Sequence, residues 1–175
     1  MNGLTHIYYG NGKGKTTASI GLIIRQLSNN KKVLLIQFLK NPQDKFSQFS
    51  EITFLEKQKG IQIFQFGSKD WVTDSKNKDA LNEVKKALVF LKEKIVLDEF
   101  DLIVADEILY ALELGLLNEN DIKDLIKNKN KKVELVLTGS HKEFDCFKLA
   151  NYVTNINKIK HPFDMGINAR EGIEY

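Results

Sequence analysis

Residues 4–17 read Leu-Thr-His-Ile-Tyr-Tyr-Gly-Asn-Gly-Lys-Gly-Lys-Thr-Thr. The aromatic and β-branched side chains of residues 4–9 predict a strand. Apolar residues recur at helical spacing from Thr17 to Leu27 and predict a helix. The turn between these elements is rich in glycine and ends in Gly-Lys-Thr. A strand, a turn of this kind and a helix together predict a phosphate-binding P-loop.

The residues of this loop have separate expected tasks. Glycines let the backbone turn its N–H groups toward one point, and the helix N-terminus adds partial positive charge. We expect Lys15 to reach the phosphates and the Thr16 hydroxyl to bind Mg²⁺, while Lys13 adds a second cation. The predicted nucleotide-binding residues of the loop are Gly10, Asn11, Gly12, Lys13, Gly14, Lys15, Thr16 and Thr17.

The spacing of the loop departs from the standard motif. The usual pattern places four residues between its first glycine and the Gly-Lys pair. Here Tyr9 occupies that first position, and Gly10 leaves only three intervening residues. The spacing favours an unusual P-loop protein over a standard ATPase. The alternative is an ordinary glycine-rich turn with no ligand.

A second chemical landmark is the stretch from Asp101 to Glu107. Its four apolar residues predict a buried strand that ends in two carboxylates, Asp106 and Glu107. In P-loop proteins this Walker B arrangement places an acid near Mg²⁺, so both carboxylates join Thr16 as candidate metal ligands. Adjacent strand residues point opposite ways, so one carboxylate would coordinate the ion and the other would accept hydrogen bonds from the loop. As a lone feature, the pair could instead cap a following helix.

The remaining pattern predicts an α/β protein. Residues 33–39 are nearly continuous in apolar side chains, as in a strand buried on both faces. Strand, helix and strand within the first forty residues form a βαβ unit, which implies a parallel sheet. Further strands are predicted over 61–66, 133–138 and 152–159, and further helices over 79–96, 108–112, 118–126 and 142–151, with weak helical character over 49–58.

Composition limits the classes of protein that are possible. A chain of 175 residues is expected to form one domain, spanning 1–175, with a formal net charge of only +3. That charge does not imply a nucleic-acid or membrane partner. The single Cys146 excludes an internal disulfide and fits a reducing, cytoplasmic location. His141 and His161 lie too far apart, without further ligands, to suggest a zinc site.

One aromatic residue has two possible roles. Trp71 lies in the loop 67–74, which follows the strand predicted over 61–66. Ligands of open α/β sheets bind at the carboxyl ends of the strands, so Trp71 is a candidate platform for a flat ligand. The alternative is a tryptophan packed beneath the loop.

Six stretches of the sequence form one combined pattern: 10–18, 33–40 with Gln37-Phe38, 101–112, 137–139, and the C-terminal run 160–167 and 172–175. Together they resemble one family, the P-loop ATP:corrinoid adenosyltransferases, which attach the 5′-deoxyadenosyl group to vitamin B12 compounds. The resemblance spans nearly the whole chain, and the short-spaced loop is typical of the family. It implies a RecA-like three-layer sandwich with a mainly parallel β-sheet and helices on both faces, in a homodimer.

The resemblance also implies a chemistry for these residues. ATP would lie reversed in the loop, and the Co(I) of a reduced corrinoid would displace the whole triphosphate. Lys13 and Lys15 would stabilise that leaving group, together with Mg²⁺ held by Thr16 and Glu107. Arg25 matches a family arginine near the nucleotide, and the alternative is a solvent-facing helix residue. A flavodoxin-type protein is the expected electron donor.

Two departures from the family concern the corrinoid. Trp71 matches an aromatic that fills the lower face of the corrin, but residues 67–70 lack the phenylalanine that usually precedes it, and Phe66 could substitute. Only nine residues precede Gly10, which leaves no room for the N-terminal arm that some members have.

The competing hypotheses are a P-loop small-molecule kinase or ATPase, and a nucleotide-dependent regulator without catalysis.

Overall fold

The computed structural model describes residues 2–43, 50–69 and 72–174. Its centre is a six-stranded sheet with the strand order β3-β2-β4-β5-β1-β6. Every pair of neighbouring strands is parallel, so the carboxyl ends of the strands meet at one edge. The strands are β1 (Thr5–Tyr9), β2 (Val33–Phe38), β3 (Ile61–Phe66), β4 (Leu102–Asp106), β5 (Glu134–Thr138) and β6 (Tyr152–Asn155).

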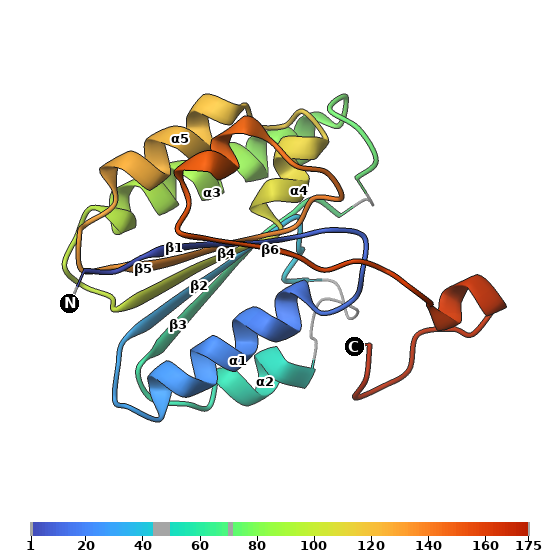
Figure 1. Cartoon of the computed structure of the whole chain (residues 1–175), viewed down its shortest axis with the longest axis horizontal. Helices are drawn as coiled ribbons and strands as arrows, with labels where there is room; N and C mark the ends of the chain where they lie inside the picture. Colours follow the sequence, from blue (N-terminus) through green and yellow to red (C-terminus); the bar gives the residue numbers. More distant parts are fainter. Residues whose placement is uncertain (1, 44–49, 70–71, 175) are drawn as a thin grey trace.

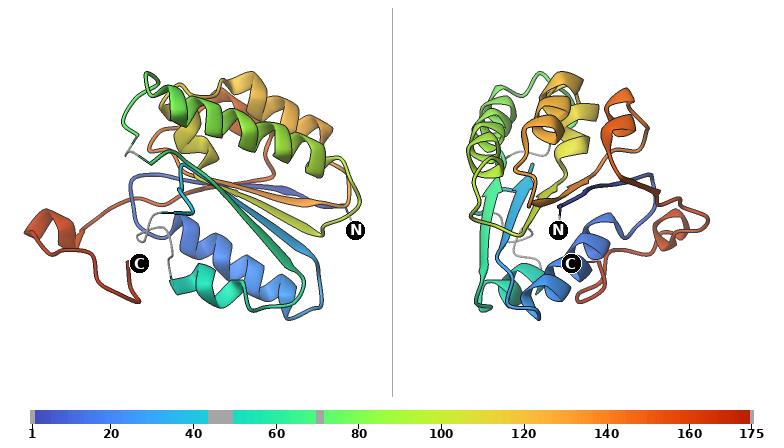
Figure 2. Two further views of the ribbon diagram at one scale, coloured as in Figure 1. Left: turned by 180° about the vertical axis from the view of Figure 1, so that it is seen from behind. Right: turned by 60° about the vertical axis from the view of Figure 1, so that its left-hand side comes forward.

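Helices cover both faces of the sheet (Figures 1 and 2). One face carries α1 (Lys15–Leu27) and α2 (Ser50–Leu55), and the other carries α3 (Lys78–Ile95), α4 (Ile108–Glu113) and α5 (Glu119–Asn128). Two short 3₁₀ helices, η2 (Asp145–Leu149) and η3 (Pro162–Met165), belong to the C-terminal part. This three-layer arrangement confirms the predicted RecA-like α/β fold.

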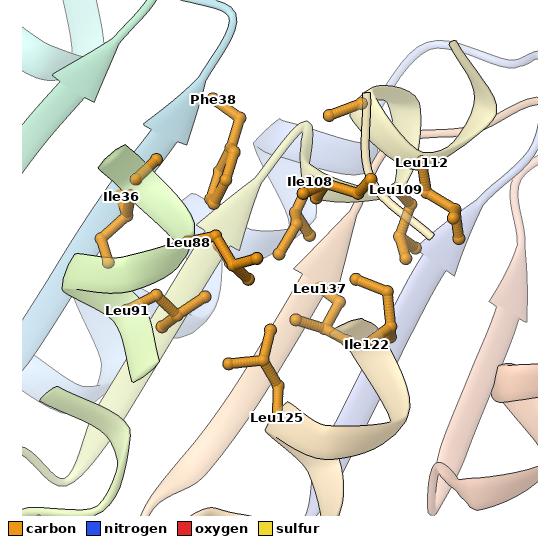
Figure 3. Close-up of a cluster of buried hydrophobic side chains, with 14 of the residues drawn as sticks. Ile36, Phe38, Leu88, Leu91, Ile108, Leu109, Leu112, Ile122, Leu125 and Leu137 are labelled. Atoms are coloured by element: carbon orange, nitrogen blue, oxygen red, sulfur yellow. The ribbon is translucent and has the colours of Figure 1, made fainter. Parts of the chain in front are cut away.

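The core has one apolar layer on each side of the sheet. Central strands bury both faces: Leu34 and Ile36 of β2 join the layer under α3, α4 and α5, whereas Leu35 joins the layer over α1 and α2. Figure 3 shows part of the larger layer, where Leu88 and Leu91 of α3 point toward the sheet. The uninterrupted apolar run of residues 33–36 therefore reflects burial from both sides.

Two predicted elements in the C-terminal part are shorter than expected. The helix predicted over 142–151 is only the single turn η2, because Phe147 packs into the core and the Asn151 N–H donates to the Thr5 carbonyl. That hydrogen bond draws the chain directly into β6. The strand predicted over 152–159 ends at Asn155, because residues 156–158 leave the sheet and bond to the P-loop.

Within residues 2–43, 50–69 and 72–174, no helix combines the length and apolar character that crossing a membrane requires. Cys146 is buried, and burial raises the pKa of its thiol to about 11. A thiol in that state is chemically inert near neutral pH.

The packing of α3 on the sheet is testable with two substitutions on one helix. Leu91 is fully buried, so Leu91→Ala should lower the free energy of unfolding by about 2–5 kcal/mol. Val89 is 57% exposed, so Val89→Ala should stay within about 0.5 kcal/mol of the wild type. Urea denaturation measures both. Equal losses would show that the two faces of α3 are assigned wrongly.

Candidate active site

A cavity of about 450 Å³ opens at the carboxyl-terminal edge of the sheet. Open α/β sheets bind their ligands at this edge. The cavity lies between the P-loop, the ends of β2 and β4, the first turn of α2 and a C-terminal turn. Its lining residues are Gly12, Lys13, Gly14, Lys15, Thr16, Thr17, Ile20, Gln37, Lys40, Glu51, Asp106, Glu107, Gly172, Ile173 and Glu174.

The glycines of the P-loop serve a close approach to the C-terminal segment. The Gly10 N–H donates to the Ser140 carbonyl at 3.0 Å, and the Gly12 N–H donates to the Ile156 carbonyl at 2.7 Å. A Cβ on Gly10 would lie 2.4 Å from the Ile156 oxygen, and one on Gly12 would lie 2.7 Å from it. Any side chain at these two positions would therefore force the loop away from residues 155–157.

Helix α1 begins at Lys15, directly after Gly14, whose φ is +123°. That left-handed backbone favours glycine and turns the chain from the loop into the helix. The first N–H groups of α1 lack partners within the helix, and the helix dipole makes this end positive. The cavity therefore meets a helix N-terminus that is suited to an anion such as phosphate.

The Lys15 ammonium is bound to the loop itself. Its Nζ donates to the carbonyls of Gly10, at 2.7 Å, and of Gly12, at 2.9 Å. Burial lowers the pKa of Lys15, and the carboxylates of Glu107 and Asp106 oppose that shift. The side chain is thus held at the cavity wall, where an entering anion can take over its hydrogen bonds.

Asp106 is the buried centre of the site. Its Oδ1 accepts hydrogen bonds from the Thr16 hydroxyl at 2.9 Å and the Thr138 hydroxyl at 2.6 Å, and its Oδ2 accepts one from Gln37 Nε2 at 3.1 Å. Gln65 donates in turn to Gln37 Oε1 at 2.9 Å. Asp106 is fully buried, and these donors satisfy a charge that would otherwise be costly to bury. Of the two carboxylates, Asp106 is the one that accepts a hydrogen bond from the P-loop.

Glu107 occupies a strained position beside it. Its φ is +61°, and its N–H donates to the Thr138 hydroxyl at 3.0 Å. Burial and the Asp106 carboxylate raise the pKa of Glu107 to about 7, while Lys40 and Lys15 partly offset the rise. A Cβ on Gly139 would lie 3.1 Å from Glu107 Oε2, so a larger residue there would press on the carboxylate.

Most of the predicted site residues surround this cavity. Gly12 to Thr17 line it, with Asp106 and Glu107. Asn11 instead bonds to the C-terminal segment, because its Oδ1 accepts from the Lys158 N–H at 2.8 Å. Arg25 lies exposed in the last turn of α1 and is not a lining residue. Trp71 lies outside the described residues.

Other contributors to the site were not assigned a role from the sequence. Gln37 and Thr138 complete the partners of Asp106. A signal existed for Gln37, because it is a polar residue inside an otherwise apolar buried strand. Gly172, Ile173 and Glu174 belong to the C-terminal run that carries the family resemblance, but no local pattern predicts that they line the cavity, which they reach through the fold of the C-terminal part.

Together, the sheet, the glycine-rich loop at the start of α1 and the buried Asp106 define a P-loop nucleotide-binding protein of the α/β class. The family model described as ATP:corrinoid adenosyltransferase BtuR/CobO/CobP matches residues 1–175. The chain belongs to this family.

Curated relatives match the chain over nearly its full length. A corrinoid adenosyltransferase of Sinorhizobium sp is 30% identical, covering 99% of this chain and 80% of the relative. The corrinoid adenosyltransferase of Escherichia coli K12 is 27% identical and corrinoid adenosyltransferase CobA of Salmonella typhimurium LT2 is 28% identical, each covering 99% of this chain and 86% of the relative.

The raised pKa of Glu107 predicts how stability depends on pH. Because the folded state holds a proton up to about pH 7 and the unfolded carboxyl releases it near 4.5, the free energy of unfolding should fall across that interval. Glu107→Gln should abolish this fall and raise stability at pH 8 by on the order of 1–3 kcal/mol. Urea denaturation at pH 5 to 8, with EDTA present, measures the free energy of unfolding of both proteins across this range.

Glu93→Gln is the matched control, because Glu93 is exposed on α3. This variant should follow the wild-type pH profile. A Glu107→Gln variant that also follows the wild-type profile would contradict the assignment of the pH dependence to Glu107.

Proposed function

We propose that this chain transfers the 5′-deoxyadenosyl group of ATP to the Co(I) of a reduced corrinoid and releases triphosphate. The observation that carries the proposal is the match of the adenosyltransferase family over residues 1–175, which includes the loop and the C-terminal residues around one cavity. Neither the family match nor the names of the relatives favour a kinase or an ATPase.

The proposed reaction places its main demand on the leaving group. Co(I) attacks C5′ of the ribose, a Co–C bond forms, and the C5′–O bond breaks with its electrons remaining on the triphosphate. Negative charge builds on that group, so preorganised donors and cations around it lower the barrier most. We propose that the N-terminus of α1, Lys13 and Lys15 supply them, which is supported by the position of both lysines in the cavity lining at the start of α1.

The same reaction needs no proton transfer at carbon or cobalt, so no general base is required. Alignment is the second demand, because the nucleophile and C5′ must be in line at contact distance. We infer that the P-loop holds ATP in the reversed direction expected for the family, so that C5′ faces the corrinoid. The loop would then bind triphosphate as a leaving group and not as a phosphoryl donor.

The donors at the site fit Mg²⁺. Among the described residues, no group of three or more His, Cys, Asp or Glu side chains could hold a metal ion. Mg²⁺, however, commonly binds through one or two carboxylates together with phosphate oxygens and water. The Thr16 hydroxyl and the carboxylates of Glu107 and Asp106 are hard oxygen donors on one cavity. When bound, the ion would neutralise charge on the triphosphate.

Further parts of the proposal rest on the family resemblance. Arg25 would act near the nucleotide, and Trp71 would contact the lower face of the corrin. Phe66 packs on Phe90, with ring centroids 6.0 Å apart, at the end of β3 that precedes Trp71. We also propose a homodimer, a flavodoxin-type electron donor and a cytoplasmic location.

The function is testable in one anaerobic assay with MgATP and chemically reduced cobalamin, followed by absorbance for Co–C bond formation. Wild-type protein should form the light-sensitive product. Lys15→Ala should lower the rate by about 10²–10³-fold, because a cation at the leaving group is lost. Lys59→Ala is the control and should keep the wild-type rate, because Lys59 is exposed and precedes the start of β3, at the opposite edge of the sheet from the cavity.

Two results would contradict the proposal. ATP hydrolysed to ADP without a spectral change in the corrinoid would exclude adenosyl transfer. An unchanged rate in Lys15→Ala would exclude the assigned role of the loop.

A further inference from the structure

Lys40 lines the cavity although it belongs neither to the P-loop nor to the Walker B pair. It follows β2 after a sharp turn at Leu39, whose φ is +60°. A left-handed backbone is unfavourable for leucine and persists only where the surroundings impose it. The chain is therefore turned out of β2 in a strained conformation directly before this lysine.

Gly67, the residue that follows β3, packs closely against the backbone of Lys40. A Cβ on Gly67 would lie 2.6 Å from both the backbone nitrogen and the carbonyl carbon of Lys40. It would also lie 2.7 Å from the Leu39 carbonyl carbon. Only glycine allows the two segments to approach this closely, so the backbone of Lys40 is fixed by its own turn and by its neighbour.

The strand order places Lys40 on the other flank of the carboxylates from the P-loop. Gln37 of β2 pairs with Asp106 of β4, and Lys40 lies three residues beyond Gln37 at the same edge. The P-loop follows β1, which β5 separates from β4. Asp106 and Glu107 therefore lie between the loop cations on one side and Lys40 on the other, and both flanks line one cavity.

The charge of Lys40 acts inside this cavity. Lys40 shares the cavity lining with both carboxylates and with the loop cations Lys13 and Lys15. Lys15 meanwhile bonds to the carbonyls of its own loop. A polyphosphate in the cavity would thus meet positive charge from two separate elements.

We propose that Lys40 is a further substrate-binding residue, which contacts the polyphosphate chain of the nucleotide from the β2 flank. This inference rests on the proposed function for the identity of the ligand. Its physical content is a charge-assisted hydrogen bond from the ammonium to a phosphate oxygen. Such a contact would bind the polyphosphate at a second point. It would also add a cation where negative charge accumulates as triphosphate departs.

Inorganic tripolyphosphate is the probe, because it contains the leaving group without adenosine. Calorimetric titration in EDTA should show roughly tenfold or greater loss of affinity for Lys40→Gln, since one charge-assisted hydrogen bond is removed. Lys59→Gln removes the same charge at an exposed site and should bind as the wild type does. Lys40→Arg retains the charge and should retain most of the affinity. Thermal melting verifies that each variant is folded.

Three results would overturn the inference. The first is a Lys40→Gln variant that binds tripolyphosphate as tightly as Lys59→Gln. The second is a loss seen only with Mg²⁺ present, which would assign Lys40 to Glu107 and the ion. The third is an equal loss in Lys40→Arg and Lys40→Gln, which would show that the charge is not what matters.

The inference and the proposed function fail in different ways. Wild-type protein that binds tripolyphosphate but forms no Co–C bond contradicts the function and leaves the role of Lys40 intact. Wild-type protein that forms the Co–C bond, with Lys40→Gln still binding tripolyphosphate normally, contradicts only the inference.

Discussion

The site depends on one buried carboxylate. Asp106 ends β4 and accepts hydrogen bonds from Thr16 of α1, Thr138 of β5 and Gln37 of β2. A charge in this environment is tolerated only while its donors remain, and each donor is in turn held by it. The interaction therefore sets where the P-loop helix sits relative to three strands of the sheet. Glu107 is the next residue, so its position depends on the same hydrogen bonds.

Strained or tightly packed backbone surrounds this centre. Three of the non-glycine residues with positive φ, Leu39, Glu107 and Ser140, follow the ends of β2, β4 and β5. Such conformations gather at sites that must present side chains in unusual directions. The C-terminal segment adds a further constraint, because Ile156 and Lys158 bond to the P-loop and the turn at 172–174 then returns to the cavity. The P-loop is thus fixed by contacts with the sheet and by contacts with the C-terminal segment.

The local patterns were enough to predict the parallel sheet, the P-loop and the Walker B pair. These features can be recognised in short continuous stretches of sequence, because strand periodicity, glycine content and the Gly-Lys-Thr motif each involve neighbouring residues. The partners of Asp106 and the position of Lys40 could not be predicted in this way. They follow from the order β3-β2-β4-β5, which is a long-range property. The predicted helix over 142–151 was wrong because Phe147 packing and the Asn151 bond outweighed local helical tendency.

Titration of MgATP into Asp106→Asn tests the central claim most directly, because the side chain keeps its shape and loses its charge. The amide would also turn an N–H toward the Gln37 donor. We expect the variant to remain folded by circular dichroism and to lose about tenfold or more in MgATP affinity, as charge-assisted hydrogen bonds within the site are lost. A folded Asp106→Asn protein with wild-type affinity would contradict the claim that this carboxylate organises the nucleotide site.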